Sequence, residues 1–286
     1  MNFAYFPGCK IPFHVPQYDE ASRIVLERLG VGIKEVEFGC CGYPVRDRDG
    51  IAYLYSAARN LALAREAKLD ILTPCKCCFG SLLKAREFMA KDSRSAAKVR
   101  EMLAAEGLAW EEDGIRVRHL MQALDQDVEG HGLAGAITRP LEGLHVAVHY
   151  GCHALRPSKL TGFDKPATPT IFERLIILCG ADTLDYPQRL ECCGNPLWGK
   201  NRELSLALLE RKLAGVRQSG ASLMACACTY CQMQLDEVQW QMDGRLGPNL
   251  PAVVLPQIVG LALGCSPSEL GIEKNRLRPV ALEPFF

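Results

Sequence analysis

The sequence lacks an apolar run long enough to cross a membrane as a helix, for which about 20 residues are needed. Its best apolar stretch, residues 252–264, is broken by Pro256 and Gln257. The first ten residues contain no basic segment followed by a long apolar run, so they do not resemble a secretory signal. We therefore expect a protein without a transmembrane segment that stays in the cytoplasm, or that reaches a membrane only through partner proteins.

An excess of charge of either sign is absent as well. Lys and Arg together number 33, and so do Asp and Glu. A neutral chain gives no reason to expect nucleic acid as a partner. The sequence also has no Gly-rich phosphate loop after a predicted strand and no flavin or nicotinamide fingerprint. Electrons for a redox reaction would therefore have to come from another protein.

Cysteine, in contrast, is abundant, with 14 residues in 286. In a reducing compartment thiols seldom form structural disulfides, so metal binding or redox chemistry becomes the leading explanation. The alternative is an extracellular disulfide framework. Such frameworks are typical of short, loop-rich chains rather than of chains with long amphipathic helices.

The cysteines indicate an internal duplication. Cys40 and Cys192 are 152 positions apart, and Cys75 and Cys228 are 153 apart. The flanking residues repeat too, since FPGC at 6–9 corresponds to HYGC at 149–152, and each Cys-Cys-Gly is followed by a proline two positions later. The matched cysteines are Cys9, Cys40, Cys41, Cys75 and Cys78 in the first half, and Cys152, Cys192, Cys193, Cys228 and Cys231 in the second.

Each half also shows the same order of predicted elements. The first half predicts strands at 2–6 and 70–73 and helices at 19–29 and 51–68. The second predicts strands at 145–149 and 222–225 and helices at 170–178 and 202–217. In each half a further strand leads to Cys-Cys-Gly, and C-x-x-C opens another helix. Alternating strands and helices favour an α/β fold of two pseudo-symmetric repeats, each a small, mostly parallel sheet flanked by helices. In such sheets ligands lie at the carboxyl ends of strands, where every cysteine group is expected.

We place the N-terminal repeat and its connector at residues 1–130 and the C-terminal repeat at 140–286. Residues 106–139 are rich in charge and glycine and form the expected connector. The apolar spacing near residues 117–124 predicts one helix within it.

Five matched cysteines in each half exceed what a simple metal cage requires. A structural zinc takes four ligands, and an ordinary four-iron cluster takes four thiolates. A Cys-Cys pair followed by Gly and then Pro predicts a tight turn that brings both sulfurs to one cluster. Alternatively, one cysteine of each pair is a buried apolar residue, since free cysteine is often fully buried.

The pattern Cys9-x30-Cys40-Cys41-Gly42-x32-Cys75-x2-Cys78 and its second copy resemble the CCG domain found in the B-type subunit of heterodisulfide reductase. The resemblance spans nearly the whole chain. The same doubled domain is similar to parts of bacterial sulfur-oxidising heterodisulfide reductase-like complexes, an unusual succinate dehydrogenase subunit and iron–sulfur subunits of glycolate oxidase.

The resemblance implies that the ten matched cysteines hold two non-cubane [4Fe–4S] clusters, one in each repeat. It also implies that a disulfide is cleaved between the paired clusters, or that a thiol or sulfane-sulfur substrate is oxidised there. The implied partners are an iron–sulfur C-type subunit, a flavin-containing A-type subunit of the same complex and a sulfur-containing substrate. Two other interpretations stay open. One is a non-catalytic relay that links a succinate- or glycolate-oxidising dehydrogenase to a quinone pathway, and the other is a structural zinc protein.

Several residues outside the matched set are candidates for other roles. Cys179 and Cys265 lie in apolar surroundings and are predicted core residues, whereas Cys77 and Cys226 stay unassigned. His153 follows Cys152 directly and His149 precedes it by three positions, so each is a candidate proton donor to a departing thiolate. Lys10 occupies the place after Cys9 that corresponds to His153, where it would stabilise an anionic substrate or cluster. For these side chains, packing, hydrogen bonding or a solvated position is the simpler explanation.

Overall fold

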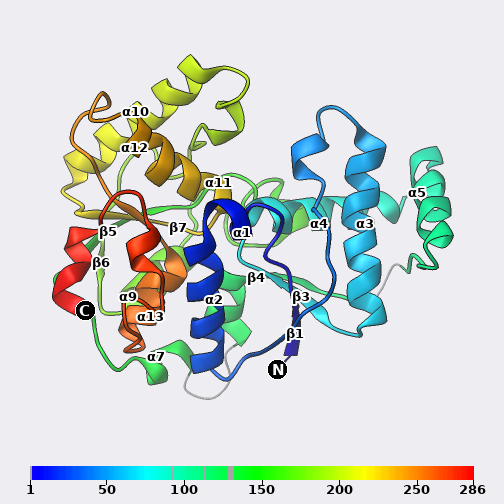
Figure 1. The fold of residues 1–286 in the computed structure, drawn as a ribbon, viewed down its shortest axis with the longest axis horizontal. Coiled ribbons are helices and arrows are strands. Elements are labelled where there is room, and N and C mark those ends of the chain that lie inside the picture. The colour runs from blue at the N-terminus through cyan, green and yellow to red at the C-terminus, as the bar shows by residue number, and fades with distance from the viewer. Residues whose placement is uncertain (1, 92, 112–113, 128–131) are drawn as a thin grey trace.

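The computed structural model describes residues 2–91, 93–111, 114–127 and 132–286. They form two four-stranded sheets in which every pair of neighbouring strands is parallel, with helices around both (Figure 1). The predicted α/β fold of two repeats is confirmed. None of the described helices is both long and apolar enough to span a membrane. The division at residues 130 and 140 stays a prediction.

The two sheets have the same strand order. The first runs β2-β1-β3-β4, with β1 at Asn2–Tyr5, β2 at Gly32–Lys34, β3 at Asp70–Thr73 and β4 at Val117–His119. The second runs β6-β5-β7-β8, with β5 at His145–His149, β6 at Asp182–Thr183, β7 at Leu223–Cys226 and β8 at Ala252–Val254. Their central strands β1, β3, β5 and β7 are buried apart from the first residue of β1, β3 and β5, as expected for parallel sheets covered on both faces.

The helices follow the predicted order in both repeats. In the first repeat they are α1 Ile11–His14, α2 Pro16–Arg28, α3 Gly50–Glu66, α4 Lys76–Met89, α5 Arg94–Ala105 and α6 Leu120–Gln122, and α7 Gly132–Ala136 follows. In the second they are α8 Ser158–Thr161, α9 Ile171–Leu178, α10 Arg202–Ser219, α11 Thr229–Gln232, α12 Gln239–Gln241 and α13 Leu255–Ala262. The Asp49 side chain accepts from Ala52 N at 2.9 Å to begin α3, and Asn201 accepts from Leu204 N at 3.0 Å to begin α10.

The prediction of one helix near residues 117–124 is wrong for the first half of that segment. Val117–His119 is instead a strand, β4, which pairs with β3 and leads directly into α6. The second repeat has the same junction, where Val254 ends β8 and Leu255 begins α13. At both junctions a glutamine side chain accepts from the backbone N–H three residues before it, Gln122 from His119 and Gln257 from Val254, each at 3.2 Å.

The two repeats pack closely against each other. Helix α2 lies beside α13 of the second repeat, and the pair stands left of the centre in Figure 1. Polar groups also join the repeats, since Gln17 Nε2 donates to Asn275 Oδ1 at 3.2 Å and Lys274 forms an ion pair with Glu20 at 2.5 Å. The buried Lys76 of α4 donates to the carbonyl oxygen of Tyr150 just after β5. The carboxyl ends of β1 and β5 therefore lie near the same junction.

Candidate metal centres

The first five predicted cysteines converge at the carboxyl ends of β1, β2 and β3. Cys9 follows β1, Cys40 and Cys41 follow β2, and Cys75 and Cys78 lie at the start of α4. Cys9 Sγ lies 3.4 Å from Cys40 Sγ. The thiols of Cys41 and Cys75 both lie within hydrogen-bonding reach of Cys78. The five sulfurs thus form a row in the order Cys9, Cys40, Cys41, Cys78, Cys75.

The second repeat builds the same arrangement. The thiol of Cys192 lies within hydrogen-bonding reach of both Cys152 and Cys193. Cys231 in turn contacts Cys193 and Cys228. The order along this row is Cys152, Cys192, Cys193, Cys231, Cys228, which matches the first row position by position.

The two rows meet at their buried ends. The thiol of Cys228 in the second repeat lies within hydrogen-bonding reach of Cys75 in the first. Ten sulfurs therefore form a continuous series that begins at the exposed Cys9, passes through the buried Cys75 and Cys228, and ends at the half-buried Cys152. Two soft thiolate sites placed end to end are suited to electron transfer between them.

Glycines hold the backbone close to these sulfurs. Gly8 has a φ of +78°, and a Cβ atom there would lie 2.7 Å from Cys78 Sγ. Gly151 is its equivalent, with a φ of +69° and 3.3 Å between a Cβ atom and Cys231 Sγ. The glycine of each Cys-Cys-Gly also has a positive φ, and Gly42 N donates to Cys40 Sγ at 3.4 Å, as Gly194 N does to Cys192 Sγ. The predicted tight turns are present in both repeats.

The thiols have strongly perturbed acidity. Hydrogen bonds from Cys41 and Cys9 lower the pKa of Cys40 to about 3. Hydrogen bonds from Cys152 and Cys193 lower the pKa of Cys192 to about 2. The thiolate is the form that binds metal, so these two cysteines, second in each row, are ready to act as ligands. A set of five thiol donors around each site fits iron–sulfur binding.

His153 lies at the junction of the repeats. Its Nδ1 atom lies 3.3 Å from Cys152 Sγ and 3.7 Å from Cys77 Sγ. Burial and nearby Lys84 and Arg46 lower the pKa of His153 to about 4. The imidazole is therefore neutral at pH 7, which favours a hydrogen-bonding role over that of a strong proton donor.

Lys10 stands in the equivalent place after Cys9. Its ammonium group lies 5.4 Å from the centre of the Tyr230 ring. Tyr230 in turn contacts the ring of Tyr43, with 5.3 Å between the ring centres. Lys10 thus faces an aromatic surface made by both repeats. Neither tyrosine was predicted as a site residue, although both lie within the cysteine motifs, in CCGYP and CTYC.

The four cysteines outside the rows differ in their surroundings. Cys77 is buried between the two rows, with its Sγ atom 3.8 Å from Cys228 Sγ. Cys226 ends β7, and its Sγ atom lies 3.1 Å from Gln232 Oε1. Cys179 and Cys265 lie in the apolar core, as predicted.

His149 lies close to two inner cysteines of the second row, Cys193 and Cys231. It is fully buried at the end of β5, and one of its ring nitrogens and the sulfurs of Cys193 and Cys231 all lie within 4.8 Å of one another. Burial lowers its pKa, so the ring is neutral and is not a ready source of a proton. The sequence indicated this residue only as a candidate proton donor. The sequence did contain an indication of a role at the second row, because His149, the first residue of HYGC, stands where the first repeat has Phe6.

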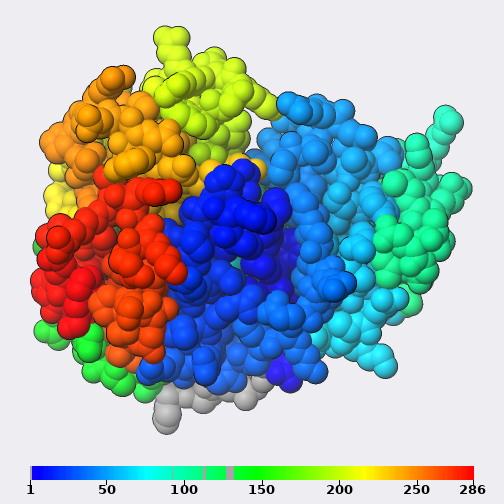
Figure 2. All heavy atoms as spheres, in the orientation of Figure 1, coloured from blue at the N-terminus to red at the C-terminus, as the bar shows by residue number. Residues whose placement is uncertain are grey.

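A groove of about 650 Å³ lies between the repeats next to the cysteine rows. Lys10, Tyr43 and Tyr230 line both this groove and the small cavity that contains Cys9, Cys75 and Cys77. At its rim Lys200 forms an ion pair with Asp47 at 2.7 Å. In Figure 2 the surface is notched at the top between the segments near residue 200 and near residue 45. Tyr43, Tyr230, Lys10 and Pro44 line both spaces and therefore stand between a small molecule in this groove and the thiols.

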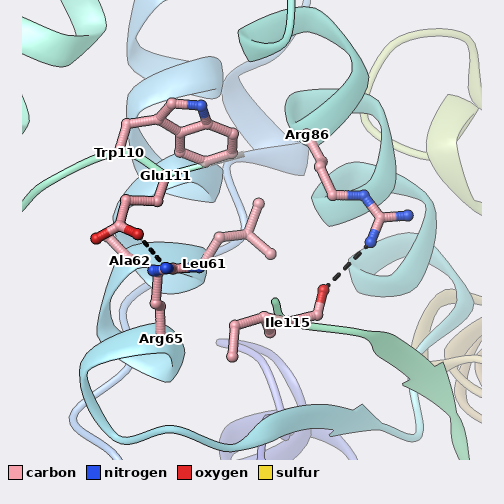
Figure 3. A pocket seen from close by; sticks show the side chains of 7 residues that line it. All are labelled: Leu61, Ala62, Arg65, Arg86, Trp110, Glu111 and Ile115. Atoms are coloured by element: carbon pink, nitrogen blue, oxygen red, sulfur yellow. Dashed lines mark hydrogen bonds and ion pairs between the residues drawn. The ribbon is translucent and has the colours of Figure 1, made fainter. Parts of the chain in front are cut away.

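Another pocket lies beside α3 and α4, away from the thiols. Leu61, Ala62, Trp110 and Ile115 line it, together with Arg65, Arg86 and Glu111 (Figure 3). Arg86 donates to the carbonyl oxygen of Ile115 at 3.3 Å across it. No cysteine or histidine is among these lining residues, so the pocket offers no place for thiol chemistry.

The family of the chain follows from comparison with known proteins. The cysteine-rich domain, CCG, matches twice, at residues 3–83 and 146–236, and these segments contain all ten sulfurs of the rows. The chain belongs to the CCG cysteine-rich domain family. The B-type subunit of the ferredoxin/F420H2-dependent CoB-CoM heterodisulfide reductase of Methanosarcina acetivorans is 33% identical, over 98% of this chain and 95% of that protein.

Two further proteins are similar over nearly all of this chain. The 8-methylmenaquinol:fumarate reductase membrane anchor subunit of Wolinella succinogenes is 32% identical, over 96% of this chain and 96% of that protein. A hypothetical protein from Helicobacter pylori has a similar crystal structure, with a TM-score of 0.75 and 17% identity; the similarity covers 96% of this chain and 51% of that one. Membership of the CCG family, with B-type heterodisulfide reductase subunits as relatives, indicates an iron–sulfur oxidoreductase subunit that transfers electrons.

Proposed function

We propose that this chain is the iron–sulfur subunit of a heterodisulfide reductase-like complex that cleaves a disulfide, or oxidises a thiol or sulfane-sulfur substrate, at two non-cubane [4Fe–4S] clusters. The observation that carries the proposal is the continuous series of ten cysteine sulfurs, which joins the repeats at Cys75 and Cys228. Cys75 lines the small cavity that shares Tyr43 and Tyr230 with the groove. The Methanosarcina acetivorans relative is named for the CoB-CoM heterodisulfide. The proposed ligands are the five cysteines of each row.

Reductive cleavage of a disulfide consumes two electrons and releases two thiolates. When bound, two clusters would supply one electron each. The chain's own contribution is to hold five thiolates around each site, to keep Cys75 and Cys228 in contact and to exclude water with Tyr43 and Tyr230, which are at most partly exposed. We propose that Lys10 attracts an anionic substrate and that His153 positions a sulfur by hydrogen bonding.

We further propose an iron–sulfur C-type subunit as the electron donor, and a flavin-containing A-type subunit in the same complex. The relatives named above are subunits of larger enzymes, which supports a complex. We place the complex in the cytoplasm, or at a membrane through its partners. The alternative is a relay without its own chemistry that feeds a quinone pathway, and the Wolinella relative, named as the membrane anchor subunit of a menaquinol-dependent fumarate reductase, favours it.

One experiment separates these functions. Protein purified without oxygen is mixed with reduced methyl viologen as the electron donor and with the CoB-CoM heterodisulfide or oxidised glutathione as the disulfide. Free thiols are then measured over time. If the isolated chain releases thiols only when the reductant is present, catalysis is supported. Full iron content without thiol release from any disulfide supports the relay. Zinc without sulfide would overturn both functions.

A further inference from the structure

The two cysteine sites differ at one buried position that the duplication makes equivalent. His149 precedes Cys152 by three residues, as Phe6 precedes Cys9. The sheets agree with this equivalence, because Tyr5 pairs with Leu72 just before Phe6, and Val148 pairs with Ala225 just before His149. The same backbone position therefore carries a hydrocarbon ring in the first repeat and an imidazole in the second.

The surroundings of these two rings are different. Phe6 packs edge-on against Phe38, with 5.0 Å between the ring centres. His149 is fully buried, and in the described part of the chain neither of its ring nitrogens has a hydrogen-bond partner. The carbonyl of Arg189 lies near the ring without a hydrogen bond of ordinary geometry. The sulfurs of Cys193 and Cys231 do lie close to a ring nitrogen.

A buried polar group without a partner is costly, because it gives up its bonds to water and receives nothing in return. An imidazole carries at least one N–H group in either protonation state, so His149 can always donate. Thiolate sulfur accepts such a bond, and a charged acceptor makes it stronger than a neutral one. When its cysteines are thiolates, the second site would provide the hydrogen-bond acceptor that His149 lacks.

Two buried ammonium groups also favour the second site. Lys212 donates to the Glu191 carbonyl oxygen at 3.3 Å, and in the first repeat the equivalent residue is the uncharged Asn60, which donates to the Cys40 carbonyl oxygen at 3.0 Å. Lys76 of the first repeat crosses to the Tyr150 carbonyl next to the second site, and its own equivalent in the second repeat is Thr229. These two buried ammonium groups, one from each repeat, are thus directed to the second row, whereas the less buried Lys10 lies beside the first.

We infer that His149 donates a hydrogen bond to a thiolate of the second site and so holds the reduction potential of the second cluster above that of the first. This inference rests on the proposed function. Reduction adds negative charge, which hydrogen bonds to sulfur and nearby cations stabilise. Solvent contact at Cys9 and the half-buried Cys40 acts in the opposite sense on the first site, but the second site has two half-buried cysteines of its own, Cys152 and Cys192. The buried groups act in a low dielectric, where such interactions are stronger. Electrons then pass from the exposed first site to the second.

The test is a redox titration of the anaerobic protein, followed by electron paramagnetic resonance. The wild type is expected to show two reduction steps. His149→Phe, which copies the first repeat, is expected to move the upper step to lower potential and to leave the lower step unchanged. The reciprocal variant Phe6→His is expected to move the lower step upward, so that the two potentials converge. His149→Gln keeps an N–H donor and is expected to leave the upper step closer to the wild-type value than His149→Phe does.

Iron and sulfide content is measured for every variant, and His149→Leu replaces His149→Phe where the latter loses iron. Unchanged steps in a fully loaded His149→Phe or His149→Leu protein would overturn the inference, and so would a shift of the lower step alone. Wild-type protein without iron would instead overturn the proposed function. Thiol release from a disulfide plays no part in this test, so a failure of catalysis and a failure of the inference give different results.

Discussion

The Sγ atom of Cys77, in the first repeat, lies 3.8 Å from Sγ of Cys228, in the second. Cys77 also approaches His153 Nδ1, at 3.7 Å, and its sulfur lies within 4.8 Å of those of Cys75 and Cys228, so it stands where the two rows meet. Its equivalent in the second repeat is Tyr230, which cannot replace a cysteine ligand. We conclude that Cys77 borders the space where the two sites face each other.

We therefore expect Cys77→Ala to retain all of its iron. Because the ligand rows close without Cys77, its removal leaves five thiols at each site. The measurement is iron and acid-labile sulfide per chain after anaerobic reconstitution. A fall to half the wild-type iron would show that Cys77, rather than a neighbour in α4, is a ligand. Cys226→Ala, which removes a thiol bonded to Gln232, is the matched control.

The wild-type protein is expected to contain about eight irons and eight sulfides, the content of two four-iron clusters. Cys78→Ser and Cys231→Ser are each expected to lower the iron content by about half, since each removes a sulfur that joins two others in its row. Cys179→Ser, at a buried position outside the rows, is the control for a lost thiol in the core. Equal iron loss from all three variants would point to unfolding instead of lost ligands.

Gly8→Ala tests the close approach of the backbone to Cys78. The added methyl group would lie 2.7 Å from the sulfur, so we expect the first site to lose its iron while the second keeps it. Gly30→Ala is a matched control, because Gly30 also has a positive φ, of +67°, but no atom lies within 4 Å of an added Cβ. Both variants share a backbone cost of about 1 kcal/mol in the free energy of unfolding. Similar iron content in the two variants would contradict the role of Gly8.

His153→Ala is expected to lower the rate of disulfide cleavage by about 10-fold or more without loss of iron. The reason is the position of Nδ1 between Cys152 and Cys77. His145→Ala, at the exposed beginning of β5, is the control and is expected to leave the rate unchanged. A rate that is unchanged in both variants would remove His153 from the site.

Lys10→Ala is expected to raise KM for an anionic disulfide more than for a neutral one.

Asp236 gives a prediction about stability. Burial raises the pKa of its carboxyl group to about 6, although two backbone N–H groups, from Arg276 and Leu277, donate to it. The folded state therefore binds the proton more tightly than the unfolded state, whose pKa is about 3.9. The bound proton contributes at most about 3 kcal/mol to the free energy of unfolding. This contribution is complete below pH 4 and is lost as the pH rises through 6.

The measurement is urea unfolding at several values of pH between 4.5 and 7.5. Asp236→Asn cannot titrate, so the free energy of unfolding of the wild type is expected to fall more steeply with pH than that of the variant. Comparing the two proteins at each pH cancels the effect of acid on the metal sites. Parallel curves would show that Asp236 titrates alike in both states.

The sequence alone predicted the repeated α/β fold and the convergence of the cysteine groups, because the duplicated motif aligns every strand end in one half with a strand end in the other. It did not predict β4 and β8. Each has three residues, and each leads into a helix without a turn residue, so the apolar spacing of 117–124 fits a helix as well as a strand. Three-residue strands depend on pairing with β3 or β7, which local sequence does not encode.

The place of His149 was hidden for a different reason. Its nearness to Cys152 in the chain suggested a proton donor to that thiol, whereas FPGC and HYGC share only their last two residues, so the change from Phe6 to His149 did not stand out. The sequence predicted that this position ends a strand, but only the fold shows that the strand is central and that His149 lies close to Cys193 and Cys231. The contact between Cys75 and Cys228 was equally hidden, because it depends on how the repeats pack.

The bond from Lys76 to the Tyr150 carbonyl runs from the first repeat to the second, and Thr229 at the equivalent place does not return it, since its hydroxyl has no hydrogen-bond partner among the described residues. Two identical subunits related by a twofold axis could make such a bond only in both directions. Fusion of the halves into one polypeptide removes that restriction, since each half can then change alone. The chain can thus give its two halves a fixed division of labour, with one side receiving charge and the other retaining it, which a symmetric dimer of a single repeat could not specify.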